Sequence, residues 1–116
     1  MRENRQQART RLLKLIKVRS ADDQRLFGHV GDISVGGMMV QTHHNIAVGD
    51  YLNLAIELPA DIHPSPLDIH AEVTWTGEKN KHNTRSFGCR FVAIEKAEHN
   101  ALLELARKYP MGEEEL

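Results

Sequence analysis

Two arginines near the start of the chain have side chains that suit a phosphate group or a guanine base. Arg5 and Arg9 stand four residues apart in the segment "RQQAR". On a helical turn this spacing would place both guanidinium groups on one side, and on a flexible arm the two groups could enclose a compact anion. A guanidinium pairs with two phosphate oxygens, or with O6 and N7 of guanine. The alternative is a solvated basic arm that contacts nothing specific.

A second candidate group follows in the segment "DISVGG". Asp32 and Ser34 are two residues apart, so both side chains point the same way on an extended strand. A carboxylate can accept hydrogen bonds from N1–H and N2–H of guanine, and a hydroxyl can donate and accept. Gly36 and Gly37 permit positive φ and let a ligand approach the backbone. The alternative is a polar strand end followed by a glycine turn that only reverses the chain.

The elements that must position these residues are short strands separated by turns. Alternating and aliphatic-rich segments predict strands over residues 12–20, 25–34 (broken by Gly28 and Gly31), 38–42, 52–58, 67–77 and 86–94. In the fifth of these strands, Trp75 continues the apolar alternation of Val73, so we expect it in the core. The alternative is a role in stacking on a nucleobase. Acidic residues early, basic residues late and Pro110 as a stop predict an amphipathic helix from about residue 95.

Six closely spaced strands and one helix predict a mainly β protein, a small antiparallel β-barrel with a C-terminal α-helix. The helix is expected to cap one barrel opening or to cover one side. We divide the chain into a flexible basic arm at residues 1–11, the barrel with its helix at 12–110, and an acidic tail at 111–116. No further domain is expected.

Composition excludes several classes of protein. A net charge of −1 gives no overall basic field for a long nucleic acid, and 5% aromatic residues offer few platforms for single strands. No apolar stretch reaches the roughly 20 residues of a membrane helix, so we expect no membrane insertion and a cytoplasmic location. The single cysteine, Cys89, excludes an intrachain disulfide and is expected to be a buried structural thiol. The seven histidines are scattered without metal-ligand spacing, and no catalytic constellation is visible, so we expect neither a metal nor an enzyme.

Together the two polar segments resemble the signature of the PilZ domain family, R-x-x-x-R followed by [DN]-x-S-x-x-G. Two later segments extend the resemblance: "AEVTW" is similar to the family's A-x-V-x-W strand, and "FGCRF" to its G-[VIC]-x-F strand. A closing helix follows, so the resemblance runs from Arg5 to about Tyr109.

The resemblance implies a six-stranded PilZ-type β-barrel that binds the bacterial second messenger cyclic di-GMP. Arg5 and Arg9 would then contact phosphates and guanine Hoogsteen edges as the arm folds over the ligand. Asp32 and Ser34 would hydrogen-bond a guanine from the barrel surface, and Gly37 would keep the turn.

Two neighbouring positions also belong to this expected site, Asn4 and Gly36. Many family members carry one or two further basic residues directly before the first motif arginine, where this chain has Asn4. That position influences whether one ligand or an intercalated pair is bound, and both remain open here.

The expected function is that of a cyclic di-GMP receptor that needs no cofactor. Ligand binding would order the arm and change a surface read by a protein partner, in motility, pilus assembly, biofilm formation or exopolysaccharide synthesis. The alternative is a PilZ-like protein-interaction module that binds no ligand. Such members usually lack the arginines or the D-x-S pair, whereas all five motif positions are kept here.

Overall fold

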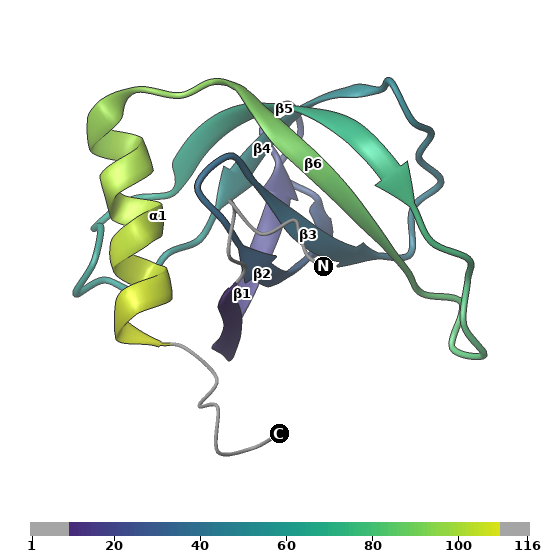
Figure 1. Ribbon diagram of the computed structural model, residues 1–116, viewed down its shortest axis with the longest axis horizontal. Coiled ribbons are helices and arrows are strands. Elements are labelled where there is room, and N and C mark those ends of the chain that lie inside the picture. Colours follow the sequence, from purple (N-terminus) through teal and green to yellow (C-terminus); the bar gives the residue numbers. More distant parts are fainter. Residues whose placement is uncertain (1–9, 110–116) are drawn as a thin grey trace, which may run out of the picture.

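The computed structural model describes the backbone of residues 10–109 and the side chains of residues 16–109 (Figure 1). Its elements are β1 (Thr10–Ser20), β2 (Leu26–Ile33), β3 (Gly37–Thr42), β4 (Tyr51–Ile56), β5 (Leu67–Thr76), β6 (Arg85–Ala93) and α1 (Lys96–Lys108). The predicted arm, apart from its last two residues, and the predicted acidic tail lie outside the described residues. The six strands and the C-terminal helix confirm the predicted fold class.

The six strands form one closed antiparallel barrel in the order β1-β2-β3-β6-β5-β4. Pairing of β1 with β4, for example Val18 opposite Ile56, closes the ring. The crossover in this order brings β3 against β6, so that Gly37 lies opposite Arg90. As a result, the β2–β3 turn and the second half of β6 share one region of the barrel surface.

Strand β2 is continuous, so the predicted break at Gly28 and Gly31 is wrong. The register of β2 against β3 shifts between Val30 and Asp32, and Gly31 falls at this irregularity. A Cβ atom on Gly31 would lie 2.6 Å from Cε of Met39. The glycine therefore makes room for a neighbouring side chain within a strand that continues through it.

The barrel interior is filled by aliphatic side chains from β1 to β5 and by Phe87 and Cys89 from β6. The largest fully buried side chains are Phe87, Ile16, Ile33, Leu54, Ile56, Leu67, Ile69, Leu102, Leu105, Val18, Val40 and Val73. Residues 67–71 of β5 alternate between buried and exposed, as expected for a strand with one face in the core and one in solvent. This packing fixes which side chains of each strand reach the outer surface.

Helix α1 stands at one end of the barrel, on the left in Figure 1, and contacts β1 and β2. Its first turn is closed by a capping box between Glu95 and Glu98, and its apolar face buries Ala101, Leu102 and Leu105 in the barrel core. The predicted amphipathic helix is thus confirmed. Among the described residues, no helix combines the length and apolar character needed to span a bilayer.

Candidate functional site

The turn between β2 and β3 contains the D-x-S-x-x-G segment. The backbone N–H of Ser34 donates to the carbonyl of Gly37 at 2.9 Å, and the Ser34 hydroxyl donates to the same carbonyl at 3.4 Å. The carbonyl of Gly36 accepts a hydrogen bond from the backbone N–H of Phe91 in β6 at 2.9 Å. The turn is therefore held both internally and by the neighbouring strand.

Gly37 in this turn is required because a side chain would clash with the neighbouring strand, and not because of its backbone conformation. Among the described glycines only Gly49 has a positive φ, so the conformational freedom expected for Gly36 and Gly37 is not used. A Cβ atom on Gly37 would instead lie 2.0 Å from the carbonyl oxygen of Cys89. Strands β3 and β6 approach each other so closely at this point that only glycine fits.

A surface pocket of about 110 Å³ opens beside this turn. Its lining residues come from β2, β3, β5, β6 and the turn: Asp32, Ser34, Gly36, Gly37, Met38, Thr74, Trp75, Gly88, Cys89 and Arg90. The structure thus brings together four of the residues selected from the sequence, Asp32, Ser34, Gly36 and Gly37. Asn4, Arg5 and Arg9 lie outside the described residues.

The start of β1 runs beside the acidic end of this pocket. In the backbone register, Thr10 lies opposite Ile33 and Arg11 lies opposite Asp32. Arg9 directly precedes Thr10 in the sequence, and consecutive Cα atoms are about 3.8 Å apart. The chain therefore enters the barrel at the place where Asp32 and Ser34 stand, which connects the two segments that were separate in the sequence.

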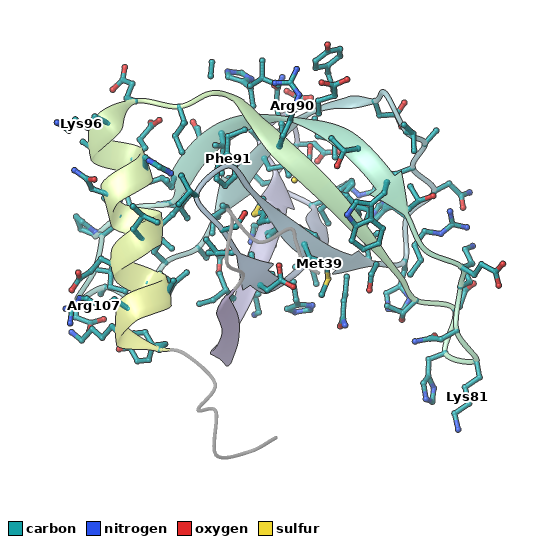
Figure 2. The ribbon with its side chains drawn as sticks, in the orientation of Figure 1. Met39, Lys81, Arg90, Phe91, Lys96 and Arg107 are labelled. Carbon is teal, nitrogen blue, oxygen red and sulfur yellow. The ribbon has the colours of Figure 1, made fainter. Side chains whose placement is uncertain are left out.

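Arg90 is a pocket residue that the sequence analysis missed. It lies opposite Gly37 on β3 and opposite Glu72 on β5. Its Nε donates to Oε1 of Glu72 at 2.7 Å, and its side chain is 55% exposed. Figure 2 shows Arg90 projecting from β6 away from the barrel interior. A signal for it exists in the sequence, because burial of Phe87 and Cys89 turns Gly88 and Arg90 outward.

Trp75 also lines the pocket, so its predicted place in the core is wrong. The pairing of β5 with β6 shifts register between Val73 and Trp75, which ends the alternation and leaves the tryptophan 37% exposed. A Cβ atom on Gly88 would lie 2.0 Å from Nε1 of Trp75. The indole therefore lies against the bare backbone of Gly88 and forms one wall of the pocket.

The remaining chemistry of the pocket suits binding. Burial raises the pKa of the Cys89 thiol to about 12, so the thiol is neutral at physiological pH. Asp32 is only 8% exposed, which places a hydrogen-bond acceptor in a largely desolvated position. Within the part of the chain that the structure describes, no cluster of three or more His, Cys, Asp or Glu side chains could hold a metal ion.

These groups together match a planar, nitrogen-rich ring with anionic substituents. A carboxylate and a hydroxyl can meet ring N–H groups, an indole offers a flat apolar face, and Arg90 offers a cation.

A family model described as the PilZ domain matches residues 3–108. This range includes both N-terminal arginines, the D-x-S-x-x-G segment, all six strands and α1. A comparison with curated proteins finds no match.

Solved structures show the same fold. The inhibitor of motility (MotI/DgrA) of Bacillus subtilis matches with a TM-score of 0.71 at 23% identity, over 92% of this chain and 51% of that chain. The PilZ domain of YcgR from Escherichia coli, solved with c-di-GMP, matches with a TM-score of 0.68 at 12% identity, over 92% of each chain. K. pneumonia MrkH in its apo state matches with a TM-score of 0.70 at 14% identity, over 93% of this chain and 52% of that chain.

The chain thus spans about half the length of two of these proteins. At such identities the likeness supports the fold alone. The match to the family model is independent of it and rests on the sequence.

Proposed function

Because the chain belongs to the PilZ domain family, a family of cyclic di-GMP receptors, we propose that it binds cyclic di-GMP at the pocket beside the β2–β3 turn. Members of this family are generally not enzymes. The ligand-binding residues we propose are Arg5, Arg9, Asp32, Ser34 and Gly37, with Asn4 and Gly36 at the margin of the site.

The observation that carries this proposal is the pairing of Arg11 with Asp32. It brings the strand that follows the R-x-x-x-R segment against the strand that ends in the D-x-S-x-x-G segment. Arg9 is two residues from Arg11, and an arginine side chain reaches several ångströms further. Both halves of the signature can therefore contact one ligand of nucleotide size.

Each residue has a role that follows from its chemistry. Asp32 accepts from N1–H and N2–H of a guanine, and Ser34 adds a hydroxyl at the same edge. Arg5 and Arg9 take the phosphates and the O6/N7 edge. The indole of Trp75 offers a stacking face for the base beside Gly88.

Arg90 can serve as a further phosphate partner. Its present partner is Glu72, at 2.6 Å from Nη2, and both groups are partly open to solvent. Such surface ion pairs contribute about 0–1 kcal/mol, so exchanging the carboxylate for a phosphate costs little. We propose that Arg90 turns from Glu72 to the ligand on binding.

The receptor would signal to a protein effector through the bound N-terminal segment. We propose that the ligand orders residues 2–9, which precede β1, against the barrel and so creates a surface that the effector recognises. Control of motility, pili, biofilm or exopolysaccharide synthesis would be the output of such a receptor.

Isothermal titration of cyclic di-GMP tests the binding proposal. We expect saturable binding by the wild type and none of comparable strength with GTP. Arg9→Ala should weaken binding roughly tenfold to hundredfold, because a charge-assisted hydrogen bond is worth about 1.5–3 kcal/mol. Asp32→Ala should weaken it as well.

Arg25→Ala is the matched control. Arg25 is an exposed arginine in the connection between β1 and β2 and does not line the pocket. This variant should bind like the wild type. If the wild type itself shows no heat of binding at millimolar ligand, the receptor proposal is wrong, and the interaction module without a ligand becomes the better description.

A further inference from the structure

The β2–β3 turn has a second support that comes from the C-terminal helix. The carbonyl of Val35 accepts a hydrogen bond from Nε2 of His99 in α1 at 2.5 Å. Val35 and His99 are 64 residues apart in the sequence. Because a carbonyl oxygen can only accept, Nε2 must carry the hydrogen. The next carbonyl, of Gly36, is held by Phe91, so two successive carbonyls of the turn are each fixed from outside it.

The ring of His99 is itself held in place. It packs edge-on against the ring of Phe91, with centroids 6.4 Å apart and planes at 74°. Figure 2 shows Phe91 on β6, near α1. The backbone N–H of His99 is bonded to the carbonyl of Glu95 at 2.9 Å, within the capped first turn of α1. The imidazole is thus attached to the helix frame and gives the turn a fixed anchor.

We propose that His99 is a positioning residue for the candidate site, holding the turn of residues 34–37 in the shape that the pocket requires. This proposal rests on the proposed function, because it assigns His99 a part in cyclic di-GMP binding without contact to the ligand. Ser34, Gly36 and Gly37 line the pocket, whereas Val35 does not line it and is 55% exposed. Fixing the carbonyl of Val35 therefore also restricts the positions of its two chain neighbours, Ser34 and Gly36, which line the pocket.

A consequence is that the ligand site and α1 are coupled. Any partner that draws α1 away from the barrel breaks the contact between His99 and Val35 and loosens the turn. By thermodynamic linkage, ligand binding then opposes displacement of α1 by the same factor. An effector that binds α1 would therefore distinguish the ligand-bound protein from the free protein.

Three substitutions separate the hydrogen bond from simple packing. His99→Leu removes the donor, and His99→Asn keeps a polar amide whose shorter side chain does not reach the carbonyl. His99→Gln places an amide N–H close to the position of Nε2 and should restore the contact. Helix α1 should stay folded in all three, because Leu102 and Leu105 anchor it and are fully buried.

Two readouts are needed. Amide exchange at residues 35–37 in the free protein measures the anchoring of the turn, and titration with cyclic di-GMP measures its effect on affinity. We expect faster exchange in His99→Leu and His99→Asn, and affinity lowered about fivefold to tenfold, since one hydrogen bond contributes about 1 kcal/mol. His99→Gln should match the wild type in both.

The matched control is His63→Leu. The ring of His63 also contacts a backbone carbonyl, that of Ser65 at 2.7 Å, but in the connection between β4 and β5. It should change neither readout. Unchanged exchange at residues 35–37 in His99→Leu overturns the proposal, and so does a His99→Gln variant that behaves like His99→Leu. If the wild type does not bind cyclic di-GMP, the proposed function fails, and the exchange data alone decide whether His99 holds the turn.

Discussion

Gly88 leaves room for the indole of Trp75, and this arrangement shapes the candidate site at the scale of single residues. The tryptophan is the only one in the chain, and it lies where a base could stack. Its position depends on the missing Cβ atom of its neighbour, which would lie 2.0 Å from Nε1. A glycine on the opposite strand thus positions an aromatic wall.

Gly88→Ala should therefore displace the indole. We expect a shift in tryptophan fluorescence, excited selectively above the tyrosine absorption band, which reports this one residue because the chain has a single tryptophan. Affinity for cyclic di-GMP should fall at least about fivefold, since stacking on an aromatic side chain is worth about 1–3 kcal/mol per base. Fluorescence spectroscopy and ligand titration measure the two effects.

Gly77→Ala is the control for this change. A Cβ atom on Gly77 would lie 3.4 Å from the carbonyl oxygen of Ser86 and 3.9 Å from Cζ3 of Trp75, both ordinary van der Waals contacts, so it would touch the same indole without displacing it. It should leave both the spectrum and the affinity unchanged. Wild-type fluorescence and affinity in Gly88→Ala would show that the indole does not depend on Gly88.

At the scale of elements, the end of α1 is attached to the connection between β4 and β5. Asp61 forms an ion pair with Lys108, 2.5 Å from Nζ, and accepts a hydrogen bond from the Tyr109 hydroxyl at 3.0 Å. Hydrogen bonds from Lys108 and then Tyr109 hold the pKa of the Asp61 carboxyl below its usual value of 3.8. The same contact raises the pKa of Lys108. These three residues tie the last turn of the helix to the barrel.

The pH dependence of this contact follows from the lowered pKa. A carboxyl with a lower pKa in the folded protein stabilises the fold above pH 3.8, and this contribution is lost as pH falls through the folded-state pKa. Asp61→Asn should therefore be less stable than the wild type at pH 7, and the difference should shrink toward pH 2. Urea unfolding at several pH values measures it.

Asp68→Asn on β5 is a suitable comparison, because Asp68 is exposed on a strand and has no part in the contact with Lys108. In an NMR titration, Lys108→Ala should move the pKa of Asp61 up toward 3.8. An Asp61 pKa that does not respond to loss of Lys108 would contradict the assignment.

At the scale of the whole molecule, the barrel is closed, so each described strand pairs with a neighbour on both sides. Where a strand is paired on both sides, a partner cannot bind by adding a strand; β1 pairs with β4 only over Val18–Ser20. The interior is filled around Phe87, which is fully buried, so large changes within the barrel would disrupt the core. In the mechanism proposed above, the signal passes through groups attached to the barrel, namely the N-terminal segment and α1.

We expect cyclic di-GMP to slow amide exchange in residues 2–9 while exchange in the barrel strands changes little. The reason is that the proposed arginines bind the ligand and fix the segment that carries them. Hydrogen exchange with and without ligand measures this. Exchange in Arg9→Ala should respond far less, and equal exchange rates in the wild type with and without ligand would rule the mechanism out.

Much of the fold could be predicted because local patterns agree with it. Strand alternation located all six strands, and the charges and Pro110 located α1. The sequence placed the first strand from Leu12, whereas β1 begins at Thr10, where pairing with Ile33 extends it. In β2, glycines suggested a break, yet the strand continues because its neighbours on both sides supply hydrogen bonds.

The candidate site could be predicted in part for the same reason. Asp32, Ser34, Gly36 and Gly37 are close in sequence, so a short motif identifies them. Arg90 and Trp75 reach the pocket from other strands, and only the strand order and register bring them there. The register shift that turns Trp75 outward depends on the pairing of β5 with β6. An alternation pattern along one strand contains no information about that pairing.

The types of element, the apolar faces and the two polar segments follow from residues near one another in the chain, so the amino-acid sequence alone predicts them. The pairing of β3 with β6, the positions of Trp75 and Arg90 in the pocket, and the contact of His99 with the turn are visible only in the folded barrel. Such contacts join residues far apart in sequence, and they form only when the barrel closes and packs its core.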